Sequence, residues 1–454
     1  MSNQRRLVMK HSRMTKFATV ATVAAFATTL LSACGGGSST TQSGHANDVE
    51  QALEKGGDLV YWTWTSSADT QVKAFEKHYP KVHVKVVNPG SGAAAYTKMM
   101  NAIKSGSNVP DIMQIEYQAL SQFYTPGNLL DLAPYGFASL KNQYAASAWS
   151  SVSVGGKVYG LPQDTGPMVL YYNKKVFDSF GISEPPKTWD EFVKDGEIMQ
   201  QKDPSVHITS DSGQGNLVAS LLWQAGSHAF KVSGSNVTIN LSDPGAQRWA
   251  AVWDKLIGEH LITTVANQGT EWYQAANKGK MASIISASWL RNTLQTSVKE
   301  SAGDWRVAPM PTYDGKPASA NYGGSSQAVY AKTKNPALAA GFVKWLNNSR
   351  ESIELATASG GFPSTVKDLN AQDFLEEKAD YFGGQQVNKV FNQSSKDIRS
   401  GWQFLPYQVY ANSIVNDSIG KAYEGSVRFE DALKTFQKDL VKYGNEQGYT
   451  VKGL

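Results

Sequence analysis

Cysteine is almost absent from this sequence, which has a single thiol, Cys34, among 454 residues. A lone cysteine cannot form a disulfide within the chain. The fold must therefore be stabilised by a hydrophobic core, and a chain of this length can bury a large one. Downstream of Cys34 the sequence also lacks any apolar run of the roughly 20 residues that a membrane span needs.

The motifs of several enzyme and cofactor classes are missing as well. The sequence contains no G-x-x-x-x-G-K-[ST], H-E-x-x-H or G-x-S-x-G, and its seven histidines include no pair at metal-ligand spacing. The stretch 90–95 matches G-x-G-x-x-A but follows the second expected strand, and Asp111 opens its strand instead of ending it. This placement favours a plain connecting loop over a nucleotide site. We expect no catalytic residue, no cofactor and no metal.

What the N-terminus does contain is a basic segment followed by an apolar one. Five basic residues and no acidic ones precede the small apolar run 17–31. At about 15 residues the run suits a secretory signal better than a membrane span. Its end, Leu31-Ser32-Ala33-Cys34, resembles a bacterial lipobox, in which the peptidase cuts before a cysteine that carries lipid. We predict a lipoprotein signal peptide over 1–33, lipidation of Cys34 and a flexible Gly/Ser-rich tether over 34–56. The alternative is an ordinary signal peptide with an incidental cysteine.

Removing that segment changes the charge of the chain. The full sequence has 43 basic and 39 acidic residues, and loss of five basic ones leaves 38 against 39, or −1. No basic stripe remains for nucleic acid and no polybasic patch for anionic lipid. We expect a monomer at the extracellular face of the cell membrane, anchored through the lipid on Cys34.

Strand and helix signals alternate at the start of the mature chain. Strands are expected over 58–64, 82–87 and 111–116, separated by helices over 68–80 and 93–106. This order predicts parallel pairing in an α/β sheet. A capping box of Thr188 and Glu191 predicts a helix start, and further amphipathic helices are expected over 244–260, 335–348 and 429–444.

Five groups of segments then follow in a set order. They are DIMQIEYQALSQF (111–123), GKVYGLPQDTGPMVLYYNKKVFDSFGI (156–182), NKGKMAS with WLRNTL (277–294), NYGGSSQAVYAKT (321–333) and GGFPST (360–365). Together they resemble the family-one extracellular solute-binding proteins of carbohydrate ABC importers, above all the oligosaccharide-binding lipoproteins of Gram-positive actinobacteria, which are related to maltose-binding protein. One departure is the tyrosine of NYGGSS, where a tryptophan often stands.

The resemblance runs from about Gly57 to the C-terminus and implies a periplasmic-binding-protein-like α/β fold. In that fold, two lobes are joined by several crossings, and the ligand lies in the cleft between them. One lobe would comprise 57–165 with 320–365, and the other 166–319 with 366–454. The implied function is a receptor, not an enzyme, that delivers an oligosaccharide to an ABC permease. A secreted carbohydrate hydrolase or lyase, and a receptor for a peptide, stay open as alternatives.

A sugar-binding site needs aromatic platforms and planar polar groups. Trp64 and Glu116 end strands of the expected sheet, where ligands of open parallel sheets lie, although a core ring and a helix cap are the alternatives. The resemblance adds Asp164 at a crossing, Trp289 as a stacking ring and Trp402 as a second platform. The remaining candidates are Trp223, Gln224, Tyr322, Gly323, Gly324 and Phe362.

Other tryptophans have the spacing of core residues. Trp249 and Trp253 are four residues apart on one helix, and Trp345 lies beside Phe342 and Leu346 in the same way. Trp189 follows its N-cap. We expect these four to pack inside the protein and not to bind ligand.

Overall fold

The computed structural model describes residues 41–454, with side chains from Asn47 onward. The predicted signal peptide, Cys34 and the first part of the tether lie outside the described residues. Within 41–454, no helix combines the length and the apolar character needed to cross a bilayer.

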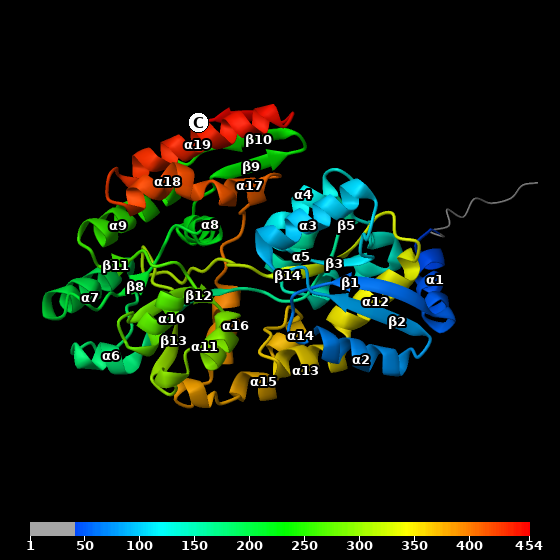
Figure 1. Ribbon diagram of the computed structural model, residues 1–454, viewed down its shortest axis with the longest axis horizontal. Coiled ribbons are helices and arrows are strands. Elements are labelled where there is room, and N and C mark those ends of the chain that lie inside the picture. The colour runs from blue at the N-terminus through cyan, green and yellow to red at the C-terminus, as the bar shows by residue number, and fades with distance from the viewer. Residues whose placement is uncertain (1–40) are drawn as a thin grey trace, which may run out of the picture. The chain divides into compact units, whose positions relative to one another are not determined.

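The first lobe is built on a five-stranded sheet with the order β2-β1-β3-β14-β6 (Figure 1). Its strands are β1 (Gly57–Trp62), β2 (Val82–Val87), β3 (Ile112–Glu116), β6 (Leu161–Pro162) and β14 (Ser325–Val329). β1 pairs in parallel with β2 and β3, which confirms the predicted parallel α/β sheet. β14 is antiparallel to β3 and brings Ser325 beside Glu116.

Helices cover this sheet, and those over 68–78, 92–105 and 336–348 lie at predicted positions. The helices of the first lobe are α1 (Thr41–Lys55), α2 (Ala68–His78), α3 (Gly92–Ser105), α4 (Leu120–Tyr124), α5 (Ala146–Val152), α12 (Pro336–Asn348) and α13 (Arg350–Ala358). One hydrophobic cluster, from Val49 to Leu161 and again from Ala328 to Leu346, joins all of them except α13 to the sheet, and α13 packs on α2 and α12. We use "first lobe" for the elements around this cluster.

The expected flexible tether is wrong for its second half, because residues 41–55 form α1. Val49 and Leu53, four residues apart, are 6% and 8% exposed. Leu53 packs against α12 so closely that a Cβ added at Gly341 would lie 3.0 Å from its Cγ. Burial of these two side chains holds α1 on the first lobe.

The second lobe contains several small sheets. Three strands pair in the order β12-β7-β13, and three more in the order β15-β10-β9. The strands are β7 (Met168–Asn173), β8 (Thr209–Ser210), β9 (Phe230–Ser233), β10 (Asn236–Ile239), β11 (Ile262–Thr263), β12 (Ser283–Ala287), β13 (Trp305–Pro309) and β15 (Thr450–Gly453). The short hairpin β4 (Ser153–Val154) and β5 (Lys157–Val158) belongs to the first lobe.

Twelve helices of the described chain surround these strands. They are α6 (Lys174–Ser179), α7 (Trp189–Lys202), α8 (Gly215–Gln224), α9 (Pro244–Gly258), α10 (Thr270–Asn277), α11 (Leu290–Ser297), α14 (Val366–Leu369), α15 (Gln372–Glu376), α16 (Val387–Lys396), α17 (Gln408–Ser413), α18 (Val415–Tyr423) and α19 (Phe429–Glu446). The predicted capping box starts α7: Oγ1 of Thr188 accepts from the Glu191 N–H, and the Glu191 side chain accepts from the Thr188 N–H.

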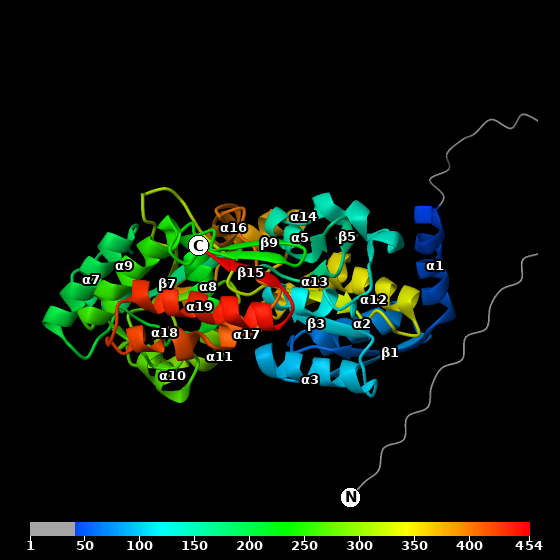
Figure 2. The ribbon, with the colours of Figure 1, turned by 90° about the horizontal axis from the view of Figure 1, so that it is seen from above.

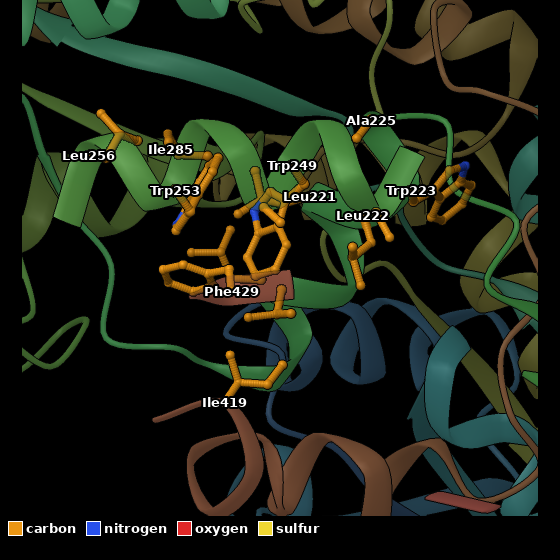
Figure 3. Packing of buried hydrophobic residues seen from close by; sticks show 14 of the residues in the cluster. Leu221, Leu222, Trp223, Ala225, Trp249, Trp253, Leu256, Ile285, Ile419 and Phe429 are labelled. Atoms are coloured by element: carbon orange, nitrogen blue, oxygen red, sulfur yellow. The ribbon is translucent and has the colours of Figure 1, made fainter. Parts of the chain in front are cut away.

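Two hydrophobic clusters form the core of the second lobe. The larger one packs α8 and α9 against the C-terminal helices, and Figure 3 shows Trp249 and Trp253 beside Phe429 within it. Trp189, Trp249 and Trp253 are at most 1% exposed, which confirms them as core residues. Tyr322 and Phe362 also pack with this lobe, although the expected ranges assigned 320–365 to the first. The exact lobe boundaries stay a prediction.

Candidate functional site

Glu116 ends β3, and a tyrosine from α3 holds its carboxylate. The Tyr96 hydroxyl donates to Oε2 of Glu116 at 2.5 Å, and the Glu116 N–H donates to the same hydroxyl at 3.3 Å. Trp64 follows β1 and meets Tyr96 edge to face at 6.2 Å. The Trp64 N–H donates to Oε1 of Gln114 at 3.0 Å, which fixes the backbone beneath the ring. The carboxyl ends of β1 and β3 thus present a half-buried indole and a half-buried carboxylate together.

Two glycines connect the lobes beside this carboxylate. Gly323 and Gly324 have φ of 84° and 89°, a conformation that glycine adopts at no steric cost. A Cβ at Gly324 would lie 2.5 Å from the Tyr117 ring. A Cβ at Gly323 would lie 3.4 Å from Nε1 of Trp289 and 4.0 Å from Oε1 of Glu116. Gly323 therefore lies between a first-lobe carboxylate and a second-lobe indole.

Trp289 stands at the N-cap of α11 and is half-buried. Its Nε1 donates to the Tyr322 carbonyl at 2.8 Å, and the two rings meet edge to face at 5.4 Å. The Tyr322 hydroxyl donates to Oε1 of Gln214 at 3.2 Å, and Nδ2 of Asn267 donates to the same oxygen at 3.2 Å. Oδ1 of Asn267 is buried without a hydrogen-bond partner.

We call the group formed by Trp64, Tyr96, Glu116, Trp289, Tyr322 and Gly323 the Gly323 site. All of these except Tyr96 are candidates from the sequence, and their role in binding a ligand stays a prediction. Gln214 and Asn267, which lie behind Tyr322, were also missed. No motif marks these three residues, because their roles depend on partners between 20 and 108 positions away in the chain.

Asp164 forms hydrogen bonds that connect the segments crossing between the lobes next to this site. Its Oδ1 accepts from the Ser325 N–H at 2.6 Å, and its carbonyl accepts from the Tyr117 hydroxyl at 2.6 Å. An isolated β-bridge also pairs it with Pro363. These contacts give Asp164 a positioning role at the junction of the lobes.

Burial raises the pKa of both carboxyl groups. The pKa of Glu116 rises because burial disfavours its charged form, although hydrogen bonds from Tyr96 and Gln118 oppose the shift. The pKa of Asp164 rises to about 6, chiefly through burial and further through the nearby charge of Glu116, against the hydrogen bond from Ser325. No ion pair among residues 41–454 includes either carboxylate.

Trp223 and Trp402 line a cavity to which Tyr117, the residue beside Gly324, also contributes. The two indole rings stack at 5.7 Å, 6° from parallel, and the cavity has a volume of about 1340 Å³. Residues of α5, α14 and α16 also line this cavity, which we call the α16 cavity. In Figure 2, α5, α14 and α16 lie along one side of the lobes, and α3, α10 and α11 along the other. The ring partners of Trp402 are Trp223, Phe230 and Phe404, and Trp289 is not among them. The role of Trp402 as a ligand platform stays a prediction.

Hydrogen bonds explain why Trp223 lies there. Its Nε1 donates to the Arg399 carbonyl at 2.7 Å, so the ring braces the segment that carries Trp402. Edges of Phe230 and Phe404 enclose Trp402, whose own Nε1 is buried without a partner. Figure 3 shows Trp223 at the end of α8, apart from Trp249 and Trp253.

Two other candidates are packing residues. Gln224 is 0% exposed, accepts from Nε1 of Trp189, and donates to the carbonyls of Pro311 and Ala318. Phe362 is 5% exposed and lies among Phe374 and Phe391 in the second-lobe core. Neither side chain offers a surface to a ligand, so the structure removes both from the candidate site.

The site suits a neutral, hydroxyl-bearing ligand. Indole and phenol rings can stack on the C–H faces of a sugar, and a carboxylate accepts its hydroxyl protons. Within the described residues, His, Cys, Asp and Glu side chains form no group of three able to hold a metal ion.

Comparisons with known proteins point the same way. The family model for bacterial extracellular solute-binding proteins matches residues 61–351. The arabinooligosaccharide-binding protein of Halalkalibacterium halodurans is 24% identical over 417 residues, covering 87% of this chain and 90% of that protein. The diacetylchitobiose-binding protein of Streptomyces coelicolor is 26% identical over 345 residues, covering 74% and 78%.

Two solved structures share the fold. The ABC transporter-associated binding protein of B. animalis subsp. lactis, in complex with β-1,6-galactobiose, is 36% identical with a TM-score of 0.80, covering 87% of this chain and 99% of that one. The galacto-N-biose/lacto-N-biose I-binding protein of Bifidobacterium longum, in complex with lacto-N-biose, is 26% identical with a TM-score of 0.76, covering 88% and 99%.

Proposed function

The chain belongs to the family of bacterial extracellular solute-binding proteins, and on that premise we propose that it binds an oligosaccharide in the Gly323 site and delivers it to an ABC import permease. It is a binding protein and not an enzyme. Relatives that bind arabinooligosaccharides, diacetylchitobiose, β-1,6-galactobiose and lacto-N-biose support a saccharide ligand.

The observation that carries this proposal is the space over Gly323. Glu116 bounds it from the first lobe and Trp289 from the second, so a ligand placed there contacts both. Only a closed arrangement of the lobes supplies both contacts. Ligand binding therefore stabilises closure by bending of the crossing segments.

A thermal-shift screen tests the proposal directly. A ligand at concentration c that binds only the native state stabilises it by RT ln(1 + c/Kd), so the melting temperature rises with the logarithm of the ligand concentration above Kd. We expect a rise with at least one of β-1,6-galactobiose, lacto-N-biose, arabinotriose or diacetylchitobiose, and none with a tripeptide mixture. A rise with the peptides alone would refute a saccharide ligand.

We propose further that Cys34 is the acylated first residue of the mature protein, at the extracellular face of the membrane. The lipobox-like Leu31-Ser32-Ala33-Cys34 after an apolar run supports this assignment. Stable anchoring needs two lipid signals, and the lipoproteins that the sequence resembles carry at least two chains. Cys34→Ala should release the protein from membranes or leave it uncleaved, as seen by detergent partitioning. Unchanged partitioning would contradict the anchor.

We also propose that the mature protein acts as a monomer in which each chain has its own complete site. Both lobes that bound the Gly323 site come from one chain, which supports this. Light scattering coupled to size exclusion should give the mass of one chain, with and without ligand. A dimer in either state would contradict the proposal.

A further inference from the structure

The Gly323 site has carboxylates but no basic partner for them. Oε1 of Glu116 would lie 4.0 Å from a Cβ at Gly323, and the Asp164 carboxylate accepts from the Ser325 N–H nearby. Neither carboxylate forms an ion pair with any basic residue among residues 41–454. The groups that hold Glu116 are a phenol and an amide, Tyr96 and Gln118.

Basic side chains gather elsewhere in the described chain. Arg291, Arg350 and Lys367 line a separate cavity of about 780 Å³, together with Glu354 and Glu377. Arg291 donates to both carboxylate oxygens of Glu377 there. Lys396 and Arg399 line the α16 cavity instead. None of these basic side chains forms an ion pair with Glu116, and none is among the groups that shift the Glu116 pKa.

This arrangement decides which ligand charges are tolerated. A hydroxyl that donates to Glu116 satisfies the carboxylate without bringing a second charge. A ligand carboxylate in the same space would set two anions within a few ångströms in a half-buried site with no counter-ion, and such a contact costs much affinity. An ammonium group would instead supply the missing cation and could lie against the indole rings.

We infer that the Gly323 site takes saccharides that are neutral or carry an amino group, and that it rejects acidic saccharides such as uronates. The inference rests on the proposed function and narrows its ligand class. The residues that carry it are Glu116 and Asp164, which exclude anions, and Trp289, which shares the space with Glu116.

Matched ligands test the inference. The probes are β-1,6-galactobiose and its two forms with a carboxylate or an amino group at C6 of the non-reducing residue, titrated by calorimetry at pH 8. Lacto-N-biose and its two corresponding forms run in parallel. We expect the amino form to bind at least as tightly as the neutral sugar, and the carboxylate form to bind at least about 100-fold more weakly.

Variants that remove one carboxylate show whether the discrimination against the acidic probe comes from the site or from the general surface charge. Glu116→Gln should improve binding of the carboxylate probe by about tenfold or more relative to wild type, because it removes the repelling charge. Glu259→Gln is the matched control, since Glu259 is exposed beyond α9 and should change nothing. Asp164→Asn should improve the same probe by a smaller factor. Melting temperatures confirm that each variant is folded.

The outcomes distinguish this inference from the proposed function. A carboxylate probe that binds wild type within about threefold of its neutral form overturns the inference and leaves saccharide binding standing. Equal binding of the carboxylate probe to wild type and to folded Glu116→Gln also overturns it. If no saccharide of any charge binds, the proposed function fails and the inference falls with it.

Discussion

Replacing Trp289 by alanine should weaken ligand binding strongly. The ring is half-buried with its Nε1 edge toward Gly323, and we expect a bound sugar to cover the part of the ring that is still exposed. Stacking contributes roughly 0.5–1.5 kcal/mol beyond area. If the sugar covers about 60 Å² of the ring, burial at ~25 cal/mol per Å² adds about 1.5 kcal/mol. The sum of about 2–3 kcal/mol corresponds to a loss of roughly 30- to 150-fold in affinity.

The same variant should also cost some stability. Nε1 of Trp289 donates to the Tyr322 carbonyl at 2.8 Å, and loss of such a bond costs about 1 kcal/mol. Calorimetric titration with the best saccharide of the screen, beside thermal unfolding without ligand, separates the two effects. Binding within about threefold of wild type would refute the placement of the site over Gly323.

Trp253→Ala is the matched control because the same ring is removed from the core. Trp253 is 0% exposed, and its Nε1 donates to Oδ2 of Asp211 at 2.7 Å. Truncation should cost about 3–5 kcal/mol of unfolding free energy through the cavity alone. The protein that stays folded should bind with nearly unchanged affinity. A large loss of affinity in this variant would mean that the loss in Trp289→Ala could also come from damage to the fold.

Three further outcomes follow from the structure. Trp402→Ala should lower the free energy of unfolding by roughly 2–4 kcal/mol in urea, because Trp402 packs against Trp223 beside the α16 cavity. Its ligand affinity, measured by titration, should stay within about threefold of wild type. A loss of affinity equal to that of Trp289→Ala would place Trp402 in the site. Asp164 keeps its proton to about pH 6 when folded, whereas the unfolded group releases it near 3.8, so its ionisation opposes folding as pH rises between these values. The melting temperature of Asp164→Asn relative to wild type should therefore increase from pH 4 to pH 7, and a constant difference would contradict the assignment. Gly324→Ala should lower the free energy of unfolding in urea by about 1–3 kcal/mol, because the residue has a φ of 89° and a Cβ there would meet the Tyr117 ring. Gly323→Ala should lower the free energy of unfolding less but weaken ligand binding. Equal free energies of unfolding for the two variants would contradict this contrast.

The sequence predicted the first sheet well because its signals are local. Strand alternation, helix periodicity and the capping box at Thr188 involve residues close in the chain, and the structure confirms them. The rule that ligands lie at the carboxyl ends of parallel strands predicted Trp64 and Glu116 as site residues, and the structure brings both against Tyr96. The tether was misjudged because its composition is polar, although Val49 and Leu53 have helical spacing.

The misplaced candidates failed for a different reason. Whether a side chain is free depends on neighbours far along the chain, as with Gln224, which donates to carbonyls at Pro311 and Ala318. Trp289 and Trp402 look alike in sequence, but one stands beside Gly323 and the other against Trp223. Nothing local indicates which distant side chains each ring will meet. Tyr96 was missed because its partner, Glu116, is 20 residues away.

The insertion of β14 into the first sheet has a consequence for how the chain folds. β14 pairs with β3 across roughly 200 residues of intervening sequence, and α12 follows it into the same core. Contacts between such distant segments must first overcome a large loop-closure entropy, and folds that depend on them form slowly. Although the first lobe begins the described chain, it cannot be completed until synthesis has passed Leu346. One edge of β3 therefore stays unpaired until the sequence from Met168 to Tyr322, and β14 after it, has been synthesised.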